Sequence, residues 1–484
     1  MKIDGAFADG VLEFALHQGA DKAEVFAAVS KSITAEARDG AVDALERADG
    51  GGFSVRILKG GRLGFAYSTD TARWRQVVDA AVESARWTAR DEYLELPSAA
   101  EAGVDAAAAS AAITGLDAAT DAAACTASGA AAACTAGRYP HVEIHDPAID
   151  SADSEVVMDM AAALERAALR FDPRVLKVRK AQASVSSSRV LIANTMGLQG
   201  GYRATRASLS ISALCEDGGE KQMGWEYDGA RFLNDVSVER TAANAASRAV
   251  RLMGSRRFKT ARKCAVALEN HVAVDFLEVL ASSLSSENVQ KGKSMLADKT
   301  GLKIISQRMS LVDDALLARA TGSRPFDAEG VASRRNILVE GGVLRGFSYN
   351  TYTAKKGGVG STGSAVRGGI SSIPGVGFSN LYIEPVSTEF VYAAGDLLWV
   401  YDKCLLITDV MGMHTANTVS GDFSVGVNGL WIEGGEVGYP VKEAVVSGNI
   451  LGFFEKVEAF GDDLKFYGST GSPSLLVGDV EISA

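Results

Sequence analysis

An alternation of apolar and polar residues with a period of two restricts the fold of this chain more than any other feature. It runs through Ala183-Ser184-Val185-Ser186-Ser187 and again through residues 207–213. Side chains of a β-strand point alternately to opposite faces of the sheet, so this pattern is typical of strands with one buried face. Residues 175–226 are therefore predicted to form a strand meander.

Shorter runs of the same pattern come earlier in the chain. Glycines at residues 50–52 and 60–61 separate some of them and predict turns there. We expect a small antiparallel sheet from these runs. Its predicted strands are residues 24–30, 32–38, 52–58 and 63–68.

Segments with helical periodicity lie between the strands. In residues 151–170, for example, Val157, Met160 and Leu164 recur at the spacing of one helix face. The predicted helices are residues 5–19, 70–90, 151–170 and 235–253. Residues 1–250 are therefore expected to form an N-terminal α+β domain of antiparallel sheets and helices. Residues 98–138 consist mainly of Ala with Thr, Ser, Gly and Asp and have no apolar stripe, which indicates an insertion in this domain.

Residues 251–484 have a different character. A predicted strand at residues 264–268 precedes a helix that carries Val272, Phe276 and Leu280. Beyond Lys303 the pattern is almost entirely strand and turn, with glycine dense over residues 357–377. We predict a β-rich, barrel-like C-terminal domain, and the whole chain belongs to the α+β class.

Charge and composition exclude several classes of protein. The 484 residues include 49 basic and 60 acidic side chains, a formal net charge of -11, which argues against direct binding of nucleic acid. We find no run of about eighteen apolar residues that would span a bilayer. The early acid Asp4 is unlike a signal peptide, and the five cysteines form no C-x-x-C pair. These features predict a cytoplasmic protein that does not cross a membrane.

Three segments of the second half, taken in order, resemble one known family. The first is Asp313-Asp314 followed by Pro325-Phe326-Asp327-Ala328-Glu329-Gly330; the second is Asn350-Thr351-Tyr352 with Ser361-Thr362-Gly363-Ser364-Ala365-Val366-Arg367; the third is Thr418-Val419-Ser420-Gly421-Asp422-Phe423-Ser424 with Trp431-Ile432-Glu433-Gly434-Gly435-Glu436 and Tyr439-Pro440-Val441. Together they resemble the TldD/PmbA peptidases, which are also called modulators of DNA gyrase. The third segment is similar to the PmbA (TldE) side of that family.

The resemblance also bears on zinc. TldD-type members bind zinc through a helix that reads HExxxH and through a Cys near the C-terminus. At the matching positions this chain has Leu277 and Ser282 in place of the two histidines, and only Glu278 remains. Residues 467–473 contain no Cys. The resemblance therefore implies no metal ligand, no catalytic residue and no cofactor in this chain, with zinc expected only in a TldD-type partner.

The function implied by the resemblance is that of a subunit of an intracellular metallopeptidase acting on unfolded or small peptides. Its partner would be a TldD-type zinc subunit or a second copy of itself. A β-rich wall can hold an extended peptide through main-chain hydrogen bonds. Ser361, Thr362, Arg367 and Asp422 are our candidates for that wall.

Two alternatives remain open at this level. His271, Asp275 and Glu278 share one helix face near Glu269 and could form a metal site of a self-sufficient hydrolase. The chain could instead be a homodimeric scaffold or peptide-binding protein without catalysis.

Overall fold

The computed structural model describes residues 4–103, 139–258 and 262–483. The first half forms a six-stranded antiparallel sheet in the order β3-β2-β1-β4-β5-β6. Its strands are β1 Lys22–Arg38, β2 Ala41–Lys59, β3 Arg62–Ser68, β4 Val175–Asn194, β5 Gln199–Asp217 and β6 Glu220–Ala230. The meander predicted for residues 175–226 is confirmed as β4, β5 and most of β6. Most of the predicted insertion at 98–138 lies outside the described residues.

The predicted glycine turn at residues 50–52 is wrong, because these glycines lie inside β2. Gly51 pairs with Val29 of β1, and a Cβ atom at Gly52 would lie 2.3 Å from Ile370 Cδ1 and 2.4 Å from the carbonyl oxygen of Ser68. Here glycine permits close approach and does not mark a turn. The two predicted strands 24–30 and 32–38 are accordingly one continuous strand, β1. The turn at Gly60 and Gly61, both with positive φ, is confirmed.

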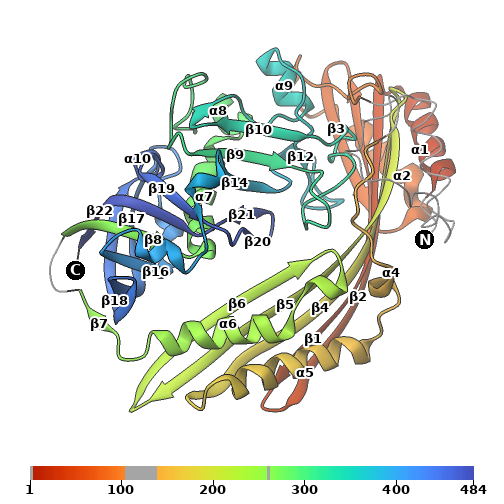
Figure 1. Cartoon of the computed structure of the whole chain (residues 1–484). Coiled ribbons are helices and arrows are strands. Elements are labelled where there is room, and N and C mark those ends of the chain that lie inside the picture. Colours follow the sequence, from red (N-terminus) through yellow and green to blue (C-terminus); the bar gives the residue numbers. More distant parts are fainter. Residues whose placement is uncertain (1–3, 104–138, 259–261, 484) are drawn as a thin grey trace, which may run out of the picture.

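Helices cover one face of this sheet at both ends. The helices are α1 Gly5–His17, α2 Trp74–Ser84, α4 Pro147–Asp150, α5 Ser154–Phe171 and α6 Val238–Arg251. Val25 of β1 packs in the core with α1 and α2, whereas Ala35 of the same strand packs in the core with α5 and α6. These two residues have the same parity along the strand, so both helix pairs lie on one face. Figure 1 shows α5 and α6 lying along the long strands.

The opposite face of the sheet contacts the second half through buried charges. Glu24 of β1 accepts hydrogen bonds from Arg56 of β2 (2.6 Å) and from Arg367 of the second half. Arg56 also donates to Glu329 at 3.0 Å. These four side chains are at most 9% exposed, so the two halves meet through a buried network of two arginines and two glutamates.

The second half contains a closed barrel, as the sequence predicts. Strands β22, β8, β16, β17 and β18 follow one another in one sheet, and an additional pairing of β22 with β18 closes the ring. The strands of this sheet are β7 Arg256–Arg257, β8 Arg262–Leu268, β15 Val391–Tyr392, β16 Lys403–Met411, β17 Asp422–Glu433, β18 Glu436–Asn449, β19 Val457–Gly461 and β22 Leu475–Ser483. In Figure 1 the barrel lies on the side of the molecule away from α1 and α2.

A second sheet of the order β11-β10-β9-β14-β21-β20 accompanies the barrel. The remaining elements are α7 Asn270–Ser283, α8 Ser286–Gln290, β9 Met309–Asp314, β10 Arg335–Glu340, β11 Val343–Leu344, α9 Thr351–Gly357, β12 Ala365–Val366, β13 Gly375–Val376, β14 Leu381–Pro385, α10 Ile450–Glu455, β20 Lys465–Tyr467 and β21 Thr470–Ser472, with short 3₁₀ turns at Thr71–Arg73, Leu233–Asp235, Thr388–Phe390, Asp396–Trp399 and Met413–Thr415. Among the described helices, none is long and apolar enough to cross a membrane.

Candidate functional site

Helix α7 carries the positions where the family resemblance places zinc ligands. Its apolar face is buried in the core that it shares with the barrel strands, and Leu277 is completely inaccessible to solvent within that core. The neighbouring Phe276 stacks on Phe453 of α10, with ring centroids 4.6 Å apart. The side chain at position 277 is therefore a core residue that points away from any site on the protein surface.

The polar residues next to Leu277 on α7 do not complete a ligand set. Glu278 is exposed, and the Ser282 hydroxyl donates to the carbonyl oxygen of Val279 at 3.0 Å. Strand β21 packs against α7, and its sequence Thr470-Gly471-Ser472 supplies hydroxyl groups but no thiol. Structural and catalytic zinc sites use imidazole, thiolate or carboxylate ligands. Within the ranges that the structure describes, no group of three or more His, Cys, Asp or Glu side chains is placed to hold a metal ion.

His271, at the start of α7, is buried and uses both ring nitrogens within the protein. Its Nε2 lies 3.0 Å from the carbonyl oxygen of Thr408, and its Nδ1 lies 3.0 Å from Nη2 of Arg248. Because a carbonyl oxygen only accepts and an arginine only donates, Nε2 carries the proton and Nδ1 accepts. Burial, reinforced by the positive charge of Arg248, lowers the pKa of His271 to about 3. His271 is thus a neutral, doubly hydrogen-bonded side chain.

One helical turn further along, Asp275 lies among other carboxylates. Burial and the negative charges of Glu278 and Asp409 raise the pKa of Asp275 to about 7. The structure therefore places Asp275 and Glu278 close together, as the sequence spacing predicts. It does not add a free imidazole nitrogen from His271 to them.

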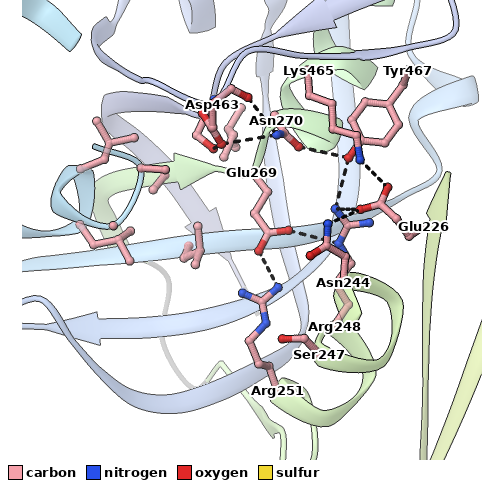
Figure 2. A pocket seen from close by; sticks show the side chains of 18 residues that line it. Glu226, Asn244, Ser247, Arg248, Arg251, Glu269, Asn270, Asp463, Lys465 and Tyr467 are labelled. Atoms are coloured by element: carbon pink, nitrogen blue, oxygen red, sulfur yellow. Dashed lines mark hydrogen bonds and ion pairs between the residues drawn. The ribbon is translucent and has the colours of Figure 1, made fainter. Parts of the chain in front are cut away.

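A cavity of about 370 Å³ lies where α6 and β6 of the first half meet β8, α7 and β20 of the second. Figure 2 shows its charged side chains gathered around Arg248. Arg248 forms ion pairs with Glu226 (3.3 Å) and Glu269 (3.4 Å). Its Nη1 also donates a hydrogen bond to the main-chain carbonyl oxygen of Trp225 in β6. This single guanidinium therefore links β6, α6 and the start of α7.

The other charged residues of the cavity extend this network. Arg251 pairs with Glu269 at 2.6 Å, and Lys465 of β20 pairs with Glu226 at 3.0 Å. Asp463 accepts hydrogen bonds from the amide nitrogen and hydroxyl of Ser474. The sequence alone did not predict this cavity. A partial signal exists in the i,i+3 spacing of Arg248 and Arg251 on the last turn of α6, but the acidic partners come from separate segments.

Three of the four predicted peptide-wall residues lie on the segment that follows α9. The hydroxyls of Ser361 and Thr362 both contact the carbonyl oxygen of Tyr349, at 3.3 and 3.1 Å, and so fix this segment to the start of α9. Arg367 is buried, donates from Nε to the carbonyl oxygen of Ala328 and forms the ion pair with Glu24.

The fourth predicted residue, Asp422, lies elsewhere, at the start of β17. It is exposed and accepts hydrogen bonds from Ser420 (2.8 Å) and Asn449 (3.0 Å), and these two donors lower its pKa. In the structure, therefore, Ser361, Thr362 and Arg367 share one segment, and Asp422 belongs to the barrel.

Comparison with known families gives matches along most of the chain. Residues 23–85 match the model of PmbA/TldA metallopeptidase domain 1, residues 147–253 match the central domain, and residues 261–484 match the C-terminal domain. Among curated proteins, metalloprotease PmbA of Escherichia coli is 27% identical over 96% of this chain and 92% of its own length. A PmbA homolog of Haemophilus influenzae is 28% identical over 98% of this chain and 94% of its own length.

Solved structures agree with these matches. A protein described as a putative modulator of a DNA gyrase from Thermotoga maritima superposes with a TM-score of 0.82 at 25% identity, and the match covers 99% of each chain. TldE from Thermococcus kodakarensis shares the fold, with a TM-score of 0.82 at 20% identity over 98% of this chain and 99% of that one. The motifs of the second half, the barrel with its helix α7 and these matches together show that the chain belongs to the PmbA/TldD metallopeptidase family.

Proposed function

We propose that this chain is the PmbA/TldE-type subunit of a two-chain metallopeptidase, in which a TldD-type partner supplies the zinc ion. The observation that carries the proposal is the environment of Leu277. A ligand at this position would have to leave a core in which the side chain has no solvent exposure. The residues present at positions 277 and 282 do not fit a zinc ion, so no catalytic step is assigned to a metal in this chain.

The names of the relatives support the same assignment. The E. coli and H. influenzae proteins that match nearly the whole chain are PmbA proteins, and a relative named metalloprotease TldD homolog, from Buchnera aphidicola, matches 61% of it at 27% identity. The partner that we propose, a TldD-type chain, is therefore a relative of this chain. A second copy of this chain is the competing partner.

In this proposal the chain contributes a wall that binds an extended peptide. Asp422 offers an exposed carboxylate, whereas Ser361 and Thr362 are half-buried and shape the backbone of their segment. Arg367 acts as a positioning residue, because its ion pair with Glu24 holds that segment against β1. Main-chain hydrogen bonds to such a wall select extended, unfolded peptides with little regard to sequence.

We also propose that residues 1–250 and 251–484 are two domains and that the protein acts in the cytoplasm. The free thiols of Cys215 and Cys404 among the described residues support a reducing compartment.

Reconstitution tests the proposed function. The purified chain and a TldD-type partner from the same source would be assayed separately and mixed, with an unfolded protein and a short peptide as substrates. We expect peptidase activity in the mixture, removed by a zinc chelator, and none from this chain alone. Chelator-sensitive activity of the chain by itself would favour the self-sufficient hydrolase, and an inactive mixture without a stable complex would favour the homodimeric scaffold.

A further inference from the structure

We propose that the cavity between α6 and α7 binds a small zwitterion with an apolar side chain. Free aliphatic amino acids and short apolar peptides have this chemistry. The proposal rests on the proposed function in one respect, since a peptidase system generates such molecules as products. Positions 277 and 282 of α7, where the resemblance places zinc ligands, do not line this cavity, and neither do the residues of the candidate peptide wall.

The charges of the cavity are balanced. Its lining contains the cations Arg248, Arg251 and Lys465 and the carboxylates of Glu226, Glu269 and Asp463. A ligand with a single net charge would pair with either the cations or the carboxylates and would disturb this balance in a partly buried site. A ligand that carries both charges fits the lining better.

The exposure of the charged side chains separates an inner from an outer layer. Glu226 (1%) and Arg248 (10%) are buried and hold each other in place. Arg251 (34%), Lys465 (22%) and Glu269 (17%) remain open to solvent. We assign the ligand carboxylate to Arg251 and Lys465 and the ligand ammonium group to Glu269.

The rest of the lining is partly polar and partly apolar, and its apolar part lies on the barrel side of the cavity. Leu397 and Leu398 of the 3₁₀ turn Asp396–Trp399 line the cavity together with Leu406 of β16 and Ala267 of β8. These residues belong to, or pack against, one apolar cluster on the outside of the barrel. Pockets for small molecules typically measure about 300–1,000 Å³. At about 370 Å³ this cavity suits a single amino acid or a dipeptide.

The position of the cavity gives binding a measurable consequence. Arg251 is the last residue of α6, a helix that packs on the sheet of the first half, whereas Glu269, Leu398 and Lys465 belong to the second half. A ligand held by both groups adds contacts across the junction of the halves. It therefore stabilises the folded chain by an amount that rises with the logarithm of the free ligand concentration once this exceeds Kd.

Binding is tested on the full chain alone by calorimetric titration and thermal unfolding. The probes are leucine, the dipeptide Leu-Leu, N-acetyl-leucinamide and glycine. We expect leucine or Leu-Leu to raise Tm, and the tighter of the two identifies the source of the ligand. N-acetyl-leucinamide lacks both charges and glycine lacks the apolar side chain, so both should bind at least about tenfold more weakly.

The variant Arg251→Gln should weaken binding of the better probe by about tenfold or more. Arg257→Gln is the matched control, because Arg257 lies on the surface in an exposed pair with Glu443. The proposal is overturned if neither zwitterion raises Tm at millimolar concentration, if N-acetyl-leucinamide binds equally well, or if Arg251→Gln binds as the wild type does. If the wild-type chain binds neither zwitterion but the reconstituted peptidase is active, only this proposal is overturned. Binding without reconstituted activity would overturn only the proposed function.

Discussion

Glu24 and Arg367 lie 343 residues apart in the chain and form a buried ion pair. Glu24 also holds Arg56 of the neighbouring strand, so one carboxylate neutralises charge from both halves. Arg367 belongs to a segment that the sequence identifies as a family motif, and Glu329 belongs to another. The motifs of this family member thus fasten the second half to the first.

Removal of Glu24 should destabilise the protein strongly. In Glu24→Ala, Arg56 and Arg367 lose a buried partner, and an uncompensated buried charge costs about 3–5 kcal/mol. Asp43→Ala is the control, since Asp43 pairs with Arg38 at the surface, where a pair contributes about 1 kcal/mol or less. Urea unfolding of both variants measures the difference. Equal losses would show that the buried network does not join the halves.

His271 should make the protein sensitive to mild acid. Its pKa is lowered from an unfolded value near 6.5 to about 3. The unfolded state therefore gains a proton below about pH 6.5 that the folded state takes up only near pH 3. Stability from this group is present above pH 6.5 and is lost as pH falls, at up to about 1.4 kcal/mol per pH unit.

The comparison of His271→Gln with the wild type isolates this effect. As the pH falls from about 6 to about 4, the free energy of unfolding should decrease less steeply in the variant. The reason is that unfolding of the variant takes up about one proton less. His17→Gln, at an exposed position near the end of α1, should keep the wild-type slope. If His271→Gln and the wild type have identical slopes, then His271 is not the buried neutral group described above.

Leu277→Ala tests whether position 277 belongs to the core. Truncation of a fully buried leucine costs about 2–5 kcal/mol. Glu278→Ala, one residue further along the same helix and exposed, should change the free energy of unfolding by about 0.5 kcal/mol or less. Thermal and urea unfolding give both values. A tolerated Leu277→Ala would mean that this side chain is free to turn toward a site.

Gly224→Ala should displace α6 from the sheet. A Cβ atom at Gly224 of β6 would lie 2.1 Å from the carbonyl oxygen of Ala245 and 2.6 Å from the amide nitrogen of Ala249. Both are backbone atoms of α6, so the helix must move, at a cost of about 1–3 kcal/mol. Gly452→Ala, in α10 with open space around it, should instead be neutral or stabilising by about 1 kcal/mol at most.

The sequence predicts local structure well where burial follows a regular period. The α5 stripe of Val157 and Leu164 and the alternation in β4 and β5 are examples, because each depends only on nearby residues. Glycines 50–52 misled the prediction, since glycine serves both turns and close packing. Which of the two applies here depends on Ile370, far away in the chain.

Features that join distant segments could not be located from the sequence. Barrel closure depends on pairs such as Val445 with Ser483, and the cavity depends on Arg248 meeting Glu226 and Glu269. The alternation of apolar and polar residues along a strand does not show which other strand pairs with it. The same reason explains why the spacing of His271, Asp275 and Glu278 suggested a metal site, although Arg248 and Thr408 occupy both nitrogens of the imidazole.

The zinc content of this chain, purified alone, tests whether the chain binds zinc by itself. Elemental analysis of the isolated protein, with its reconstituted TldD-type partner as the positive control, compares zinc per chain in the two. We expect far less than one zinc ion per copy of this chain and close to one per partner chain. Near-stoichiometric zinc in this chain alone, retained after dialysis, would contradict this expectation.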